Sequence, residues 1–358
     1  MTSVLIMAGG TGGHVYPGLA VARVLHHRGV DVVWMGTRQG LEAKLVPPAG
    51  FHMEWISIKG LRGRGVTGWL LLPFRMMIAM GQALSVFLRR RPSVVLSMGG
   101  FVAGPGGLVA WLLRRPLVIH EANAIPGFTN RFLALVATRV LCGFPGTFGN
   151  RPKAKHVGNP VRKEIFELPA PEERLSGSHD RLRVLIIGGS QGARALNIAV
   201  ASTFKEMSPD GRPELWHQCG ARWLDETRSA YGDKLNAVRL VEFIDDMAEA
   251  YRWADVVLCR SGAMTVAELA AAGVGAILVP FPYATDDHQT ANAQYLVDRE
   301  AAILLPEAEC TSAKLQELFN SLGQNRDVVL KMAQHARECA MPDADVVVAQ
   351  VCEELAHA

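Results

Sequence analysis

The stretch SVLIMAGGTGG at residues 3–13 returns as RVLIIGGSQGA at residues 183–193. In each copy an apolar run ends in a glycine-rich loop, and a segment with helical periodicity follows. This order is typical of a parallel β-strand that leads into a helix, whose free N–H groups at its N-terminus can hold an anion. Two copies in 358 residues predict two α/β domains of similar build. A phosphate-bearing ligand held at these loops is the first functional hypothesis.

The rest of the chain repeats the same alternation of apolar, β-rich runs and helix-like segments, which predicts parallel sheets covered by helices. The predicted strands are 4–8, 32–35, 94–98, 117–120 and 140–142, then 184–187, 215–219, 238–241, 256–259, 276–279 and 302–305. We place an N-terminal domain at 1–160 and a C-terminal domain at 161–358, with a proline-containing linker at 168–178. The helix-like tail after Asp343 could pack back on the N-terminal domain.

Charge is distributed unevenly along the chain, although the net charge is only +3. Residues 1–160 hold 18 Lys and Arg but only four acids (Asp31, Glu42, Glu54 and Glu121), a net of +14, so the remainder carries −11. Such a basic half predicts an anionic partner, namely nucleic acid, a phospholipid surface or a charged ligand. The alternative is that basic side chains are simply concentrated on one surface and bind no anionic partner. The six cysteines form no CxxC pair, as expected of reduced, structural cysteines.

Two apolar segments of the chain are candidates for membrane or targeting elements. The N-terminal run lacks a preceding basic region and is cut short by glycines, which indicates a first strand rather than a signal peptide. Residues 69–88 are interrupted by Pro73 and Arg75, which disfavours a membrane span. This segment is either an amphipathic helix at a membrane surface or a core helix. The arginines around it are Arg62, Arg64, Arg75, Arg89, Arg90, Arg91, Arg114 and Arg115.

Polar groups at predicted strand ends mark the first half of a candidate site. Thr11 adds a hydroxyl to the first glycine loop, and His14 stands where loop becomes helix, a suitable place for a general base unless it is structural. A second glycine loop spans 99–107, and Glu121 and Asn123 follow the next strand. No Lys-Ser/Thr follows the glycines, so the loop is not a P-loop, and the pattern disfavours a dinucleotide oxidoreductase.

The C-terminal half offers matching loops. Ser190 lies in the second copy of the glycine loop, and residues 260–268 lead from a strand into a helix. Glu268 could accept hydrogen bonds from both hydroxyls of a ribose. Alternatively, its negative charge near the start of the helix could simply interact with the helix dipole. Gln289 and Asn292 lie on one helical face, suited to sugar hydroxyls. Because no predicted strand contains Asp-x-Asp, a metal-held diphosphate is not expected.

Eight motifs in order resemble one family along nearly the whole chain: GGTGGHVYPGLAVA, GGFVAGPGG, HEAN, GNPVR, GGSQGAR, EFIDDM, CRSGAMTVAE and HQTANA. They are similar to the bacterial UDP-N-acetylglucosamine–N-acetylmuramyl-(pentapeptide) pyrophosphoryl-undecaprenol N-acetylglucosamine transferases. The resemblance implies a GT-B glycosyltransferase fold with two Rossmann-like domains facing a cleft. It also implies transfer of N-acetylglucosamine, with inversion, to the 4-hydroxyl of lipid I, giving lipid II for peptidoglycan synthesis. Neither a cofactor nor a metal is implied.

The resemblance also assigns candidate roles to particular residues. His14 and Glu121 are the implied catalytic candidates, and Phe101 stands where tyrosine is common in the family, so a phenol has no role there. The implied donor-binding residues are Thr11, Gly12, Gly13, Asn123, Arg162, Ser190, Ile244, Ala263, Met264, Thr265, Val266, Ala267, Glu268 and Gln289.

Two other classes of function remain open from the sequence. A UDP-N-acetylglucosamine 2-epimerase would share the fold and the donor but would need no lipid acceptor. A membrane-surface scaffold would bind a nucleotide without turnover. The resemblance instead implies a peripheral membrane enzyme, which we expect on the cytoplasmic face of the inner membrane. The excess of arginine in residues 1–160 predicts that its N-terminal domain docks on anionic lipid rather than on nucleic acid.

Overall fold

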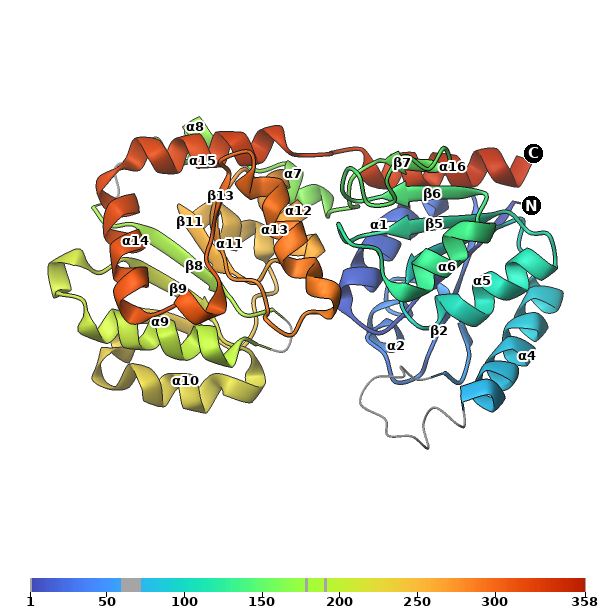
Figure 1. Ribbon diagram of the computed structural model, residues 1–358, viewed down its shortest axis with the longest axis horizontal. Coiled ribbons are helices and arrows are strands. Elements are labelled where there is room, and N and C mark those ends of the chain that lie inside the picture. Colours follow the sequence, from blue (N-terminus) through green and yellow to red (C-terminus); the bar gives the residue numbers. More distant parts are fainter. Residues whose placement is uncertain (1, 59–71, 178–179, 190–191, 358) are drawn as a thin grey trace. The chain divides into compact units, whose positions relative to one another are not determined.

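The computed structural model describes residues 2–58, 72–177, 180–189 and 192–357, and the chain divides into two compact units (Figure 1). Unit 1 comprises Met1–Val161 and Asp343–Ala358, and unit 2 comprises Arg162–Pro342. The chain thus passes from unit 1 to unit 2 one residue beyond the predicted boundary, and its C-terminal segment returns to unit 1.

Within the described residues, unit 1 holds a seven-stranded parallel sheet in the order β3-β2-β1-β4-β5-β6-β7. Its strands are β1 (Ser3–Ala8), β2 (Asp31–Gly36), β3 (His52–Trp55), β4 (Val94–Gly99), β5 (Leu117–Glu121), β6 (Arg139–Cys142) and β7 (Ala154–His156). Its helices are α1 (Gly12–His27), α2 (Glu42–Leu45), α4 (Leu72–Arg90), α5 (Ala103–Leu112), α6 (Phe128–Val136) and α16 (Ala344–His357). The order of strands reverses between β1 and β4, where Rossmann-like folds bind ligands beyond the carboxyl ends of the strands.

Unit 2 repeats this plan with a six-stranded parallel sheet among its described residues, in the order β10-β9-β8-β11-β12-β13. The strands are β8 (Arg183–Ile187), β9 (Glu214–Gln218), β10 (Val238–Val241), β11 (Val256–Cys259), β12 (Gly275–Leu278) and β13 (Ala302–Leu304). The helices are α7 (Lys163–Phe166), α8 (Pro171–Arg174), α9 (Arg194–Glu206), α10 (Leu224–Tyr231), α11 (Met247–Trp253), α12 (Ala263–Ala272), α13 (His288–Val297), α14 (Ser312–Gln324) and α15 (Arg326–Glu338), with short 3₁₀ turns between them. Its switch point lies between β8 and β11.

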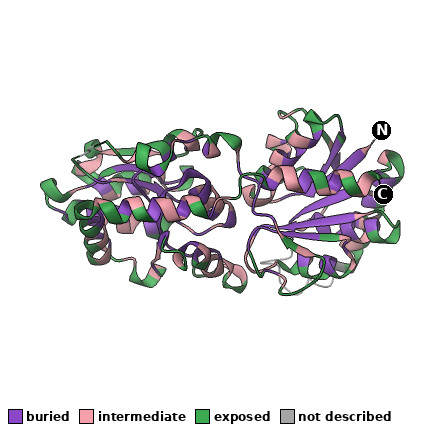
Figure 2. Ribbon diagram, turned by 90° about the horizontal axis from the view of Figure 1, so that it is seen from above, coloured by how far each residue is buried: buried purple, intermediate pink, exposed green. Residues whose placement is uncertain are grey.

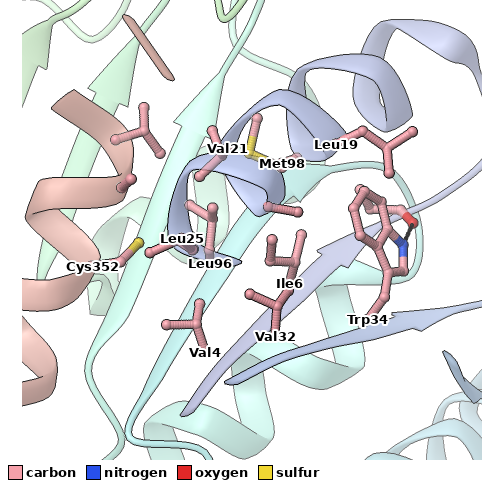
Figure 3. Close-up of a cluster of buried hydrophobic side chains, with 14 of the residues drawn as sticks. Val4, Ile6, Leu19, Val21, Leu25, Val32, Trp34, Leu96, Met98 and Cys352 are labelled. Atoms are coloured by element: carbon pink, nitrogen blue, oxygen red, sulfur yellow. Dashed lines mark hydrogen bonds between the residues drawn. The ribbon is translucent and has the colours of Figure 1, made fainter. Parts of the chain in front are cut away.

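The interior strands such as β1, β4 and β11 are buried on both faces, and exposed residues concentrate on the helices and loops (Figure 2). In unit 1, α1 and α16 cover one face of the sheet, where Cys352 joins a cluster that includes Ile6, Leu25 and Leu96 (Figure 3). Trp34 is fully buried in the same cluster, and its indole N–H donates to the Ala8 carbonyl over 2.9 Å. This bond anchors the end of β1 directly before the first glycine loop.

The predicted linker at 168–178 is wrong in part, because the structure places helix α8 there. Arg174 at the end of α8 donates to the carbonyl oxygens of Ala254 and Gly273 at 2.5 and 2.6 Å. Arg337 on α15 donates to the carbonyl oxygen of Leu168 at 2.8 Å. These two guanidinium groups attach the stretch to unit 2, and a proline-rich composition alone did not reveal those distant acceptors.

Unit 2 contains a buried histidine that should make it sensitive to acid. The Nδ1 of His217 accepts from the Tyr231 hydroxyl at 2.8 Å, and its Nε2–H donates to Oδ1 of Asn197 at 3.0 Å. Burial lowers the pKa of His217 from 6.5 to about 3. The unfolded chain therefore binds a proton that the native state excludes, and stability should fall by about 1.4 kcal/mol per pH unit as the pH drops below 6.5.

The measurement is the ring ¹⁵N shift of His217, which should remain that of neutral imidazole at pH 5, together with urea unfolding between pH 7 and 4.5. A ring that is already protonated at pH 5 in the folded protein would contradict this prediction.

Candidate functional site

The two glycine loops of unit 1 pack against each other at the switch point of its sheet. Gly100 has φ +83°, and a Cβ placed on it would lie 2.5 Å from the carbonyl oxygen of Gly9, so only glycine fits there. The Phe101 ring lies against Gly10, where a Cβ would be 3.3 Å from its Cε1 atom. The predicted placement of both loops at one sheet edge is confirmed by the order of β1 and β4.

His14 lies in the first turn of α1 with its imidazole against the second glycine loop. A Cβ on Gly99 would be 3.0 Å from both Cδ2 and Nε2 of the ring. Nδ1 is buried and has no hydrogen-bond partner within the part of the chain that the structure describes. Burial lowers the pKa of His14 below 6.5, although the negative charges of Glu121 and Glu42 act in the opposite direction. The ring is therefore neutral near pH 7, which is the form that accepts a proton.

Glu121 ends β5 and is 3% exposed. Its Oε1 accepts from the backbone N–H of Asn123 at 2.9 Å and from that residue's amide at 3.2 Å. Its Oε2 accepts from the Gly127 N–H at 3.0 Å and from the Asn130 amide at 2.9 Å. Four donors thus engage this carboxylate, which would have to release one of them to accept a proton. The geometry suits a charge that orders the loop after β5, and this charge also raises the pKa of His14 against the effect of burial.

The other site residues predicted in unit 1 lie around the same sheet edge. Thr11 is the exposed N-cap of α1, and Gly12 and Gly13 form the first turn of that helix. No side chain caps these N–H groups among the described residues, so they can meet an anion beyond the sheet. Asn123 is held beside this edge by Glu121.

Sequence reasoning missed Glu42, a fully buried acid on α2. Its Oε2 accepts from the Gly10 N–H at 3.0 Å, and its Oε1 accepts from both the N–H and the hydroxyl of Thr37 at 2.8 Å. A Cβ on Gly9 or Gly36 would come within 2.7 Å of the Glu42 side chain. One carboxylate therefore joins the first glycine loop to the loop after β2. The available signal was the scarcity of acids in a basic half of the chain.

We expect Glu42→Gln to loosen the first glycine loop. The amide N–H₂ would face backbone donors, and the lost charge-assisted bonds are each worth about 1.5–3 kcal/mol. Chemical denaturation should show a loss of about this size, and hydrogen exchange at Gly10 should accelerate. Asp31→Asn, which alters an exposed acid of the same unit, should change stability by less than about 0.5 kcal/mol. Equal effects of the two variants would refute a bracing role for Glu42.

In unit 2 the switch point is occupied by the loop that leads from β11 into α12. Gly262 is the N-cap of α12 and provides no side-chain cap, so the first N–H groups of the helix stay open to an anion. One turn further on, Glu268 accepts from Arg162 Nη2 at 3.3 Å and from the Tyr251 hydroxyl at 3.1 Å. Burial raises the pKa of Glu268, while Arg162 and Tyr251 act to lower it. Tyr251 was not predicted, because its helix position gives no sign of a carboxylate partner.

The remaining predicted residues of unit 2 lie in separate loops and helices. Gln289, in the first turn of α13, accepts at Oε1 from the Phe281 N–H at 2.9 Å and so ties the helix to the loop after β12. Ile244 is buried in the loop after β10. Ser190 lies outside the described residues. The predicted stretch of α12 is Ala263, Met264, Thr265, Val266 and Ala267, of which Ala263 and Val266 are buried.

Comparison with known proteins identifies the family of the chain. Residues 4–142 match the glycosyltransferase family 28 N-terminal domain, and residues 183–348 match the C-terminal domain of that family. A UDP-N-acetylglucosamine--N-acetylmuramyl-(pentapeptide) pyrophosphoryl-undecaprenol N-acetylglucosamine transferase from Nitrosococcus oceani is 55% identical, with 99% of this chain and 98% of the relative covered. The protein of that name from Alkalilimnicola ehrlichii is 52% identical, with 99% of each covered.

A solved structure agrees with these relatives. The crystal structure of MurG from Acinetobacter baumannii matches with a TM-score of 0.85 and 38% identity, covering 99% of this chain and 100% of that one. The predicted GT-B type, with two Rossmann-like domains, is confirmed by this match and by the two parallel sheets. The chain belongs to the family of UDP-N-acetylglucosamine–N-acetylmuramyl-(pentapeptide) pyrophosphoryl-undecaprenol N-acetylglucosamine transferases.

Proposed function

We propose that the protein transfers N-acetylglucosamine from UDP-N-acetylglucosamine to the 4-hydroxyl of lipid I, with inversion, to give lipid II for peptidoglycan synthesis. The observation that carries this proposal is 55% identity over nearly the full length to a transferase named for that donor and that acceptor. The 2-epimerase and scaffold alternatives have no comparable support.

We assign the acceptor to unit 1 and the donor to unit 2. Neutral His14 takes the proton of the acceptor hydroxyl while the oxygen attacks the anomeric carbon of N-acetylglucosamine. The bond from that carbon to the UDP oxygen breaks on the opposite face, which inverts the configuration. Glu121 stabilises the imidazolium that forms.

The donor is held by the second unit through complementary polar groups. Glu268 binds the ribose hydroxyls, and the N-terminus of α12 binds the diphosphate. The backbone of Ile244 recognises the uracil, and Gln289 binds the hydroxyls of N-acetylglucosamine. Thr11, Gly12, Gly13, Asn123, Arg162 and Ser190 complete the proposed set of contacts to the donor. This scheme assigns no step to a metal or a cofactor.

The test of the reaction is product analysis with a lipid-linked N-acetylmuramyl-pentapeptide acceptor. UDP release should require the acceptor, and mass spectrometry should show one added N-acetylhexosamine. A 2-epimer of the UDP-sugar, formed without any acceptor, would instead establish the epimerase alternative.

We further propose that unit 1 binds an anionic membrane at the cytoplasmic face of the inner membrane, and that it does not bind nucleic acid. Helices α4, α5 and α6 lie side by side (Figure 1). Their outer sides expose Met77, Leu112, Phe128 (73% exposed) and Leu135 (65% exposed). Apolar anchors beside basic groups suit the surface of an anionic bilayer.

Helix α4 has one side in the core and another that exposes apolar residues, which supports the proposal of a surface role beside its packing role. Ala83, Val86 and Phe87 pack into the core, whereas Phe74 and Met77 are exposed. None of the helices searched within the described residues is long and apolar enough to cross a bilayer. The predicted apolar residues Trp69, Leu70 and Leu71, with Arg62 and Arg64, lie outside the described residues.

The ion pairs of unit 1 guide the choice of arginines for this proposal. Arg89 and Arg90 form ion pairs with Glu54 at 2.5 and 2.7 Å, so their charges are partly neutralised. Three of the four acids in residues 1–160 (Glu42, Glu54 and Glu121) are buried, which leaves Asp31 as the exposed one. The exposed arginines Arg91, Arg114 and Arg115 are therefore the better candidates.

Replacing Arg91, Arg114 and Arg115 together by glutamine should weaken binding to acidic vesicles by about 1 kcal/mol per charge. Binding of the wild-type protein should also fall with added salt, since surface charges are screened within about 10 Å at 0.1 M. Vesicle sedimentation at several salt concentrations measures both effects. The same change of charge at Lys205, Arg222 and Lys331, exposed positions of unit 2, serves as the control. Salt-insensitive binding would contradict the electrostatic proposal.

A further inference from the structure

A cavity of 460 Å³ opens in unit 1 at a place that the proposed reaction does not use. It lies at the carboxyl ends of β2 and β3, beside the first turns of α4. Its lining includes Arg38, Gln39, Trp55, Ser57, Arg75 and Ile78. The cavity therefore combines two cations with aromatic and aliphatic walls.

Both cations of this cavity lack a carboxylate partner among the residues that the structure describes. The Arg38 guanidinium lies 5.2 Å from the centre of the Trp55 ring, which orients it. The nearby acids Glu42 and Glu54 are already engaged, the first by backbone N–H groups and the second by Arg89 and Arg90. Two unpaired guanidinium groups at one cavity favour an anion, and their planar donors match a carboxylate.

The cavity is braced to the first glycine loop. Thr37, which lines the cavity, shares the Glu42 carboxylate with the Gly10 N–H. Neighbouring strands lie about 4.8 Å apart, so the ends of β2 and β3 are roughly 5–10 Å from the end of β1 along the sheet edge. A group held here is therefore within reach of a ligand whose hydroxyl meets His14.

We propose that this cavity binds a carboxylate of the peptide that the acceptor carries, an inference that rests on the proposed function. A peptide attached through its N-terminus ends in a carboxylate, and five extended residues span about 17 Å at most, enough to cover the distance from the glycine loop. Arg38 and Arg75 bind the carboxylate, and Trp55 and Ile78 contact the adjoining side chains. Through Glu42 the cavity is connected to the first glycine loop, beside the reacting groups. This connection favours a group of the substrate as the ligand, because binding of a membrane phospholipid would not require it.

The test is steady-state kinetics with two soluble, short-chain acceptor analogues. One carries the free pentapeptide, and in the other every peptide carboxylate is converted to a carboxamide. Arg38→Gln and Arg75→Gln should each raise KM for the free-peptide acceptor at least about tenfold. Neither variant should change KM for the amidated acceptor, which should already be high for the wild-type protein, nor KM for UDP-N-acetylglucosamine. Arg139→Gln is the matched control, because Arg139 begins β6 and so lies at the amino ends of the strands, away from the cavity at their carboxyl ends.

Several results would overturn the proposal. One is that the wild-type protein has the same KM for the two acceptors. Another is that the variants raise KM equally for both acceptors. Loss of vesicle binding with unchanged KM would assign the cavity to a phospholipid phosphate instead. Arg38→Lys, which keeps the charge but not the planar fork, replaces Arg38→Gln if that variant does not fold. If sugar is transferred to both acceptors with the same KM, only this inference is refuted. If no sugar is transferred to either acceptor, the proposed function is refuted as well.

Discussion

Replacing His14 by alanine should lower kcat by about 10²–10⁴-fold, the usual contribution of a positioned general base. The neutral ring is half-buried beside Gly99 of the second glycine loop and lies close enough to Glu121 to feel its charge, so it is suited to take the acceptor proton. Affinity for UDP-N-acetylglucosamine should change little if His14 is the base, and should fall if His14 instead positions the diphosphate. His27→Ala, at the exposed far end of the same helix, should leave kcat unchanged.

The pH dependence of single-turnover rates separates His14 from Glu121. Because the pKa of His14 is lowered, the acidic limb of the wild-type profile should lie below pH 6.5. His14→Ala should abolish this limb. Glu121→Gln should shift it to lower pH, because the negative charge of Glu121 favours the imidazolium. The base assignment fails if His14→Ala keeps near-normal chemistry while Glu121→Gln loses both the limb and the rate.

Glu268→Ala should weaken UDP-N-acetylglucosamine binding by about 1.5–3 kcal/mol for each charge-assisted bond lost, that is, at least about tenfold. The carboxylate is held by Arg162 and Tyr251, so its direction is set before the ligand arrives. UDP should lose affinity to the same extent as the UDP-sugar, since the ribose is common to both. Titration calorimetry on the folded variant measures both affinities.

Two further variants sharpen the test of Glu268. Tyr251→Phe removes one positioning hydrogen bond but keeps the carboxylate, so its effect should be smaller than that of Glu268→Ala. Glu338→Ala, on the exposed side of α15, is the matched control. Wild-type affinity of a well-folded Glu268→Ala protein would remove the ribose assignment and leave a helix-dipole role.

The interior strands of both sheets were predictable from sequence, whereas two edge strands were not. Strands such as β1 and β8 are continuous apolar runs because both of their faces are buried. The missed strands β3 (His52–Trp55) and β7 (Ala154–His156) are short and polar, and they lie at the two edges of the unit 1 sheet. A partly buried edge position tolerates polar residues, so no apolar run marks these two strands, whereas the edge strands β10 and β13 of unit 2 are apolar and were predicted.

The candidate site divides in the same way. Glycine loops and polar residues at strand ends were visible because all strands of a parallel sheet point their carboxyl ends to one edge. Their partners were not visible. Gly10 and Glu42 are 32 residues apart, and Arg162 and Glu268 are 106 apart. No local pattern pairs groups at such separations.

The sequence by itself determined two Rossmann-like halves and the loops that carry their polar groups, because strand burial and glycine conformation are local properties. Only the tertiary structure decided which carboxylates are engaged. It shows Glu121 saturated by four donors and Glu42 bracing a glycine loop. It also decided that α16 packs on α1, where Cys352 enters the core of unit 1. Such pairings depend on packing in three dimensions, since a buried polar group takes the partner that the fold brings within hydrogen-bond distance.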